Sequence, residues 1–142
     1  MTASQDIATK LSGIITLNLT LGTNLFYGPY QYFVDGMIPV NCVFCLQTAG
    51  QRVQPYKPTS SLTYREGERN FRVDILIRSN KQEFGRGEDL AIRVSNALDM
   101  SPPPGYVEAR TINTAPNYLR KDDLDCHLWT VSVDVMKVGT PT

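Results

Sequence analysis

Residues 70–98, NFRVDILIRSNKQEFGRGEDLAIRVSNAL, change their hydrophobic period half-way along, and this change limits the fold more than any other feature of the chain. In the first half, apolar and polar side chains alternate: Phe71, Val73, Ile75 and Ile77 against Arg72, Asp74 and Arg78. A period of two with β-branched residues is typical of a half-buried strand. The sequence therefore predicts a strand here, with one face in the core.

The second half has the period of a helix. Leu90, Val94 and Leu98 fall four residues apart and form one apolar stripe. Glu88 and Asp89 are expected in the first turn, where acidic residues favour the helix dipole. Residues 79–87, which include two glycines, are expected to be the connection, and the prolines at 102–104 end the helix.

Bulk properties exclude several classes of protein. The 142 residues suit one domain, expected to span 1–142. The 14 basic and 14 acidic residues give a net charge of zero, so no global field attracts nucleic acid or a membrane surface. No secretory signal or membrane-length apolar run is visible. Three cysteines do not make a disulfide framework and favour synthesis in a reducing cytosol.

The remaining elements extend this strand and helix. We expect a first helix capped by Ser4, then strands at 39–48, 106–112 and 127–138, with a hairpin tip at 121–123. Residues 51–69 contain two prolines and many polar residues, which favours a long loop that is mobile on its own. The expected fold class is α+β: a single, mostly antiparallel β-sheet with two α-helices packed on it and a long loop or hairpin extension.

Possible metal and redox ligands do not form a convincing site. Cys42-x-x-Cys45 has a ligand spacing, but residues three apart on a strand point to opposite faces. Cys126 and His127 are adjacent and diverge in the same way. Inert, buried cysteines are the better interpretation, and we expect no metal and no cofactor.

Three further motifs receive structural interpretations. Asp122, Asp123 and Asp125 lack the glycine and glutamate of a calcium loop and are expected in a solvated turn. The glycines at 85 and 87 lack the rest of a dinucleotide fingerprint. His127, the single histidine, is expected to be structural, so we predict no catalytic residues and no enzyme activity. The aromatic residues at 27–33 could line the core edge or form a contact surface.

The order of these motifs resembles a family of phage proteins. The run IPVNCVF at 38–44 is similar to an early strand entry in the tail-terminator (tail-completion or minor capsid) proteins of long-tailed bacteriophages. FRVDILIR, EDLAIRVSNAL and WTVSVDVMKV resemble that family's central strand, covering helix and last strand. The resemblance spans most of residues 6–138 and rests on structural motifs without a catalytic signature.

The resemblance implies a structural virion protein at the head-proximal end of the tail, made in the host cytoplasm. Such proteins form a homo-oligomeric ring, a hexamer, which caps the tail tube protein, stops its growth and offers a surface to the head connector or stopper protein. DNA passes through the lumen without sequence-specific binding, and no membrane is involved. A head–tail adaptor or stopper of the neck is the first alternative. A small α+β ligand-binding or enzymatic domain, using the aromatic cluster and His127, is the second.

The expected contact segments are 51–69 and 79–87. Aromatic and arginine side chains are enriched at protein interfaces. Within the two segments, the candidate interface residues are Arg52, Tyr64, Arg65, Phe84 and Arg86.

Overall fold

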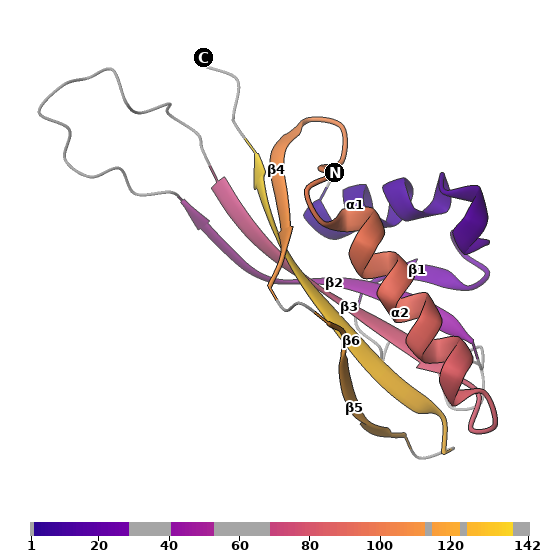
Figure 1. Cartoon of the computed structure of the whole chain (residues 1–142). Coiled ribbons are helices and arrows are strands. Elements are labelled where there is room, and N and C mark those ends of the chain that lie inside the picture. Colours follow the sequence, from indigo (N-terminus) through magenta and orange to yellow (C-terminus); the bar gives the residue numbers. More distant parts are fainter. Residues whose placement is uncertain (1, 29–40, 53–68, 113–114, 123–124, 138–142) are drawn as a thin grey trace, which may run out of the picture.

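The computed structural model describes residues 2–28, 41–52, 69–112, 115–122 and 125–137, with the backbone alone at 48–52 and 69. Its helical elements are α1 (Ala3–Ser12), the short 3-10 helix η1 (Ile15–Leu17) and α2 (Phe84–Leu98). Its strands are β1 (Leu25–Tyr27), β2 (Cys42–Arg52), β3 (Arg69–Ser79), β4 (Tyr106–Thr111), β5 (Asn117–Lys121) and β6 (His127–Lys137) (Figure 1).

The six strands form one open sheet in the order β1-β2-β3-β6-β4, and β5 pairs with the other half of β6. Every pairing is antiparallel except that of β1 with β2. Both α-helices cover the same face of the sheet (Figure 1). The fold is therefore α+β, as predicted from the sequence.

The core lies between this face and the two helices. β3 and β6 pair so that Val73, Ile75 and Ile77 lie opposite Val133, Val131 and Trp129. The apolar positions of both strands therefore share one face, and the helices complete the buried cluster with Ile7, Leu11, Ala91, Val94 and Leu98. The predicted core is confirmed, except that Phe71 and Leu90 are only partly buried at its margin.

The first helix begins earlier than the sequence suggested. Thr2, not Ser4, is the N-cap: its Oγ1 accepts from the backbone N–H of Gln5 at 3.2 Å. Gln5 Oε1 accepts in return from the backbone N–H of Thr2 at 2.8 Å, which completes a capping box. The prediction was wrong because Ser4 and Thr2 are both good caps, and only the pair with Gln5 satisfies two helix donors.

The start of α2 is also a correction. The helix begins at Phe84, so the connection is only 80–83 and both glycines lie in the first turn. Glu88 and Asp89 consequently follow the first turn and do not sit at its N-terminus. Glycine normally disfavours a helix, but Gly87 is buried against Ser79 and Trp129 and lets the helix approach the sheet. Tertiary packing therefore overrides local propensity here.

Two strand assignments also change. β2 begins at Cys42 and continues to Arg52, past the predicted end at 48, because it remains paired with β3 beyond a bulge near Gln47. β5 was not predicted, since its five side chains are all exposed and show no hydrophobic alternation. It pairs with the beginning of β6 and continues the sheet edge after β4.

Candidate interaction surfaces

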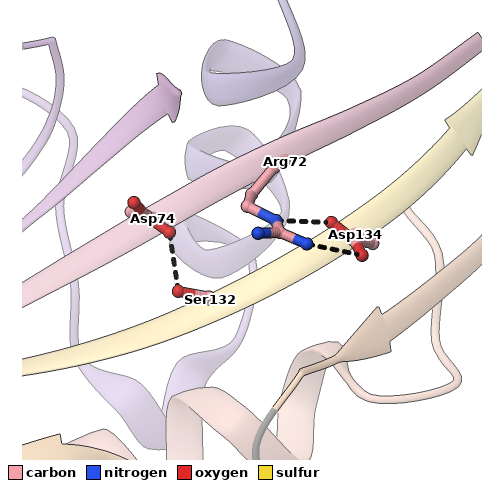
Figure 2. A network of polar contacts seen from close by, with 4 residues as sticks. All are labelled: Arg72, Asp74, Ser132 and Asp134. Atoms are coloured by element: carbon pink, nitrogen blue, oxygen red, sulfur yellow. Dashed lines mark hydrogen bonds and ion pairs between the residues drawn. The ribbon is translucent and has the colours of Figure 1, made fainter. Parts of the chain in front are cut away.

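The sheet face opposite the helices carries a row of charged and polar side chains. Arg72 on β3 lies opposite Asp134 on β6, with its Nε and Nη2 at 3.1 and 3.4 Å from the two carboxylate oxygens (Figure 2). Next to this pair, the Ser132 hydroxyl donates to Asp74 Oδ1 at 2.6 Å. The alternation of β3 and β6 places these polar positions outward, as predicted from the sequence.

The charged row continues onto β4. Arg110 lies opposite Asp134 in the strand register, and its Nε is 2.6 Å from Glu108 Oε1. The hydrogen bond and charge of Asp134 raise the pKa of Arg72. The Arg72 and Asp134 side chains remain 49% and 47% exposed, so their attraction is weakened by water and contributes little to stability. This face is therefore a solvated surface with charges of both signs.

One end of the same face is closed by a buried ion pair. Arg78 Nε lies 2.7 Å from Asp122 Oδ2, and the two side chains are only 1% and 8% exposed. Asp122 Oδ1 also accepts from the backbone N–H of Cys126 at 3.0 Å. The prediction of a solvated Asp122 was wrong, because its carboxylate is buried in the ion pair with Arg78 at the end of β3. Asp125 is exposed as expected, and Asp123 lies outside the described residues.

A cluster of four rings lies at the start of α2, on the helix side of the sheet. Phe84 packs against Tyr118, His127 and Trp129 with centroid separations of 5.4, 5.0 and 4.7 Å. Tyr118 and Trp129 also contact one another, at 4.9 Å. Phe84 is 43% exposed and Tyr118 42% exposed, whereas His127 and Trp129 are buried. The cluster therefore presents two partly exposed rings on a buried base.

His127 holds this cluster in place. Its Nε2 lies 3.0 Å from the carbonyl oxygen of Lys81, which can only accept, so Nε2 carries a proton. Its Nδ1 lies 3.0 Å from the Tyr118 hydroxyl, which donates to it in the neutral ring. Both ring nitrogens are thus engaged in contacts that join β5 and β6 to the loop before α2. This geometry agrees with the predicted structural role.

The three predicted interface residues that the structure describes, Arg52, Phe84 and Arg86, do not come together in one site. Arg52 is the last residue of β2, and Phe84 and Arg86 lie at the opposite end of the sheet, where α2 begins. Arg86 is exposed and pairs with Glu83 at 2.9 Å. Tyr64 and Arg65 lie outside the described residues. Tyr118, which contacts the candidate Phe84, was not among the predicted residues, because its only sequence signal is an aromatic residue within a polar run.

The described residues offer little that reacts or binds metal. Burial raises the pKa of both Cys42 and Cys45 to about 12, which disfavours the thiolate at neutral pH. Within the described ranges, no three His, Cys, Asp or Glu side chains gather closely enough to hold a metal ion.

In the same part of the chain, neither helix is long and apolar enough to cross a membrane. Tyr27 of the aromatic run is half exposed, and residues 30–33 lie outside the described part.

A small cleft of about 160 Å³ separates α2 from the segment before β1. Arg86 and Arg93 line its helix side, and Asn18 and Asn24 line the other. Arg93 Nε pairs with Asp89 at 3.0 Å within the helix. The helix therefore neutralises its own arginines at this cleft, which weakens it as an anion site.

Comparisons with known proteins support the fold. No family model matches this chain, and a search of curated proteins gives no match. The chain is similar to a chain in the virion of a native gene transfer agent particle, with a TM-score of 0.61 and 12% sequence identity. The similarity covers 96% of this chain and 95% of that one. At this identity, the comparison establishes a shared fold over essentially the whole length.

Proposed function

We propose that this chain is a structural protein of a phage or phage-like virion. The observation that carries the proposal is the similarity to a virion chain over nearly the full length of both. The resemblance of the sequence motifs to tail-terminator proteins points independently in the same direction.

More specifically, we propose a tail terminator that forms a homo-oligomeric ring, a hexamer, on the finished tail tube. In this role the protein stops tube growth, faces the head connector or stopper, and lets DNA pass through the lumen without reading its sequence. It acts at the head-proximal end of the tail and has no enzyme activity. A head-to-tail interface that repeats around a closing axis is the simplest way to build such a ring.

Two features of the fold suit this role. The end of β2 and the beginning of β3 run out beyond both helices, and α2 begins at the other end of the sheet (Figure 1). Phe84, the first residue of α2, packs there against Trp129. Unlike surfaces at opposite ends are what a head-to-tail contact needs. We therefore retain Arg52, Phe84 and Arg86 as proposed contacts with neighbouring virion chains. The proposal for Tyr64 and Arg65 rests on the sequence alone.

The decisive experiment is to remove the gene from a strain that produces the particles. Electron microscopy should then show overlong tails without heads, and a plasmid copy should restore normal particles. Tails of normal length that fail to join heads would favour a head–tail adaptor or stopper instead. Particles of normal appearance and infectivity or transfer efficiency would refute a structural role in the virion.

A second experiment addresses the ring directly. The purified protein, at increasing concentrations and with purified tail tubes, can be followed by mass photometry and negative-stain microscopy. The proposal predicts closed rings of uniform size on the tube ends. A Phe84→Asp, Arg86→Glu variant, checked to be folded by thermal melting, should form fewer closed rings of subunits, whereas Arg110→Glu on β4 serves as an exposed control.

A further inference from the structure

The outer edge of β4 is closed by the residues that end α2. The backbone N–H of Met100 donates to the Ala109 carbonyl at 2.8 Å. The backbone N–H of Thr111 donates to Asp99 Oδ1 at 3.1 Å. Edge strands with free backbone groups are templates for pairing, and covering them removes the template. β4 is therefore protected against another strand along this part of its length.

The opposite edge, at β1, is closed in a similar way. The N–H of Leu25 donates to the Thr20 carbonyl at 3.2 Å, and the Leu25 carbonyl accepts from the Gly22 N–H at 2.9 Å. β1 has only three residues, which also limits any added pairing. Local chain thus occupies outward-facing backbone groups of Leu25, Ala109 and Thr111 at the two ends of the strand order.

β5 is different. Among the described residues, the backbone of Asn117–Lys121 bonds to β6 and to nothing on its outer side. All five of its side chains are exposed. The strand contains two cations, Arg120 and Lys121, and no acidic residue. Within the described part of the chain, neither cation forms an ion pair.

Apolar surface borders this open edge. Leu119 on β5 is 50% exposed, and the partly exposed rings of Tyr118 and Phe84 lie beside each other. Tyr118 is fixed by Trp129 beneath it and by its hydrogen bond to His127. A rigid aromatic ring loses little entropy when a partner packs on it, which makes it a good anchor.

We propose that the outer edge of β5 docks an extended, acidic strand from a partner protein. The strand would extend the sheet through backbone hydrogen bonds and place an apolar side chain against Tyr118 and Phe84 on one face. Its carboxylates would lie near Arg120 on the other face, because Arg120 pairs with Leu128 whereas Tyr118 pairs with Trp129. A second copy of β5 fits less well, because it would bring two more cations into the same ribbon. The inference does not depend on the proposed role in a virion.

The test uses a blocked heptapeptide in which valine and glutamate alternate, and a second peptide with lysine in place of glutamate. Binding to the full chain is followed by two-dimensional amide NMR and by hydrogen exchange. We expect saturable binding of the glutamate peptide, with slower exchange at the outward-facing amides of β5. The lysine peptide should bind at least about tenfold more weakly, since it meets like charges.

Charge reversal supplies the matched variants. The double variant Arg120→Glu, Lys121→Glu should bind the glutamate peptide about tenfold more weakly than the original chain does and should bind the lysine peptide more tightly. Arg110→Glu, on the closed edge of β4, should leave both affinities unchanged, and thermal melting confirms that each variant is folded. The proposal is overturned by the absence of saturable binding, by equal binding of the two peptides, or by shifts confined to other strands. Without peptide, hydrogen exchange at the β5 amides could become slower as the protein concentration rises. This result would identify a second copy of the chain as the occupant of the edge and would also overturn the proposal.

Discussion

Replacing Gly87 by alanine tests how closely α2 approaches the sheet. A Cβ atom at this position would lie 2.7 Å from Ser79 Cβ and 2.8 Å from Trp129 Nε1, and would also contact Ser79 Oγ. Both neighbouring side chains are buried, at 2% and 4% exposure, so neither can swing into solvent. The helix would have to move away from β3 and β6 to accept the new methyl group.

Two opposing effects set the size of the result. Alanine is favoured over glycine in a helix by up to about 1 kcal/mol. Overpacking a well-filled interior typically costs about 1–3 kcal/mol. Moving Trp129 would also disturb its contact with Phe84, whose ring centroid is 4.7 Å away. We therefore expect Gly87→Ala to lower the free energy of unfolding by about 1–2 kcal/mol.

Gly85 provides the matched control, because it lies in the same helical turn. A Cβ atom there meets nothing within 4 Å, so only the helix propensity changes. Gly85→Ala should stabilise the protein by about 0.5–1 kcal/mol. The opposite signs expected at two neighbouring glycines separate the packing effect from the propensity effect.

The assay is urea unfolding followed by far-ultraviolet circular dichroism, which reports mainly on the backbone. The midpoint should shift in opposite directions for the two variants, with unchanged slope. Adding Ser79→Gly to Gly87→Ala should recover part of the loss, as a coupling energy of about 1 kcal/mol. If Gly87→Ala is as stable as Gly85→Ala, the close approach of α2 to the sheet is refuted.

Three further predictions concern the core, the thiols and a buried tyrosine. Val133 is fully buried, so Val133→Asp should prevent folding, and a soluble variant with a cooperative melt would contradict the assigned core. At pH 8 a thiol reagent should modify Cys42 and Cys45 only after unfolding, because burial raises the pKa of each thiol to about 12. Elemental analysis of the protein should find no bound zinc. Stoichiometric zinc that is lost in the double variant Cys42→Ala, Cys45→Val would show that these cysteines are not inert. The Tyr106 hydroxyl donates to Asp6 Oδ2 at 2.7 Å, so Tyr106→Phe should cost about 1–2 kcal/mol at pH 7 in urea unfolding. Burial, and then Asp6, raise the pKa of Tyr106 above its usual 10.0, so the unfolded chain loses this proton first. Stability should therefore fall as the pH rises above about 10, and a fall of equal size in Tyr106→Phe would show that another group causes it.

Local periodicity predicted most of the sheet correctly. β3 and β6 alternate over nearly their whole length, and α2 repeats its apolar residues at helical spacing, so each pattern reports the face that becomes buried. β5 was missed because a strand that is exposed on both faces has no hydrophobic period to detect. The start of α2 was predicted too late because glycine normally disfavours a helix. At position 87 glycine is needed because Ser79 and Trp129 leave no space for a Cβ atom, and neither residue belongs to the helix.

The candidate surfaces were predicted less completely. Phe84 and Arg86 were identified from residue type and position near a loop, and both are exposed. Tyr118 could not be paired with Phe84 in advance, since the contact depends on β5 folding back along β6. Nothing in the sequence indicated that Arg78 and Asp122 are buried, because charged residues are usually solvated. Each is buried only because it pairs with the other, which lies 44 positions away in the chain.

The sequence by itself determined the class of the fold, the strands and helix that bury apolar faces, and the placement of Cys42 and Cys45 on a strand. These properties follow from side-chain periods of two and about 3.6, which act over a few neighbouring residues. Only the tertiary structure decided which edges of the sheet are closed, which ion pair is buried, and which rings meet at the start of α2. Those features form where segments that are distant in the chain meet. Each contact contributes to stability only after the pairing of β6 with its neighbours has brought both partners together.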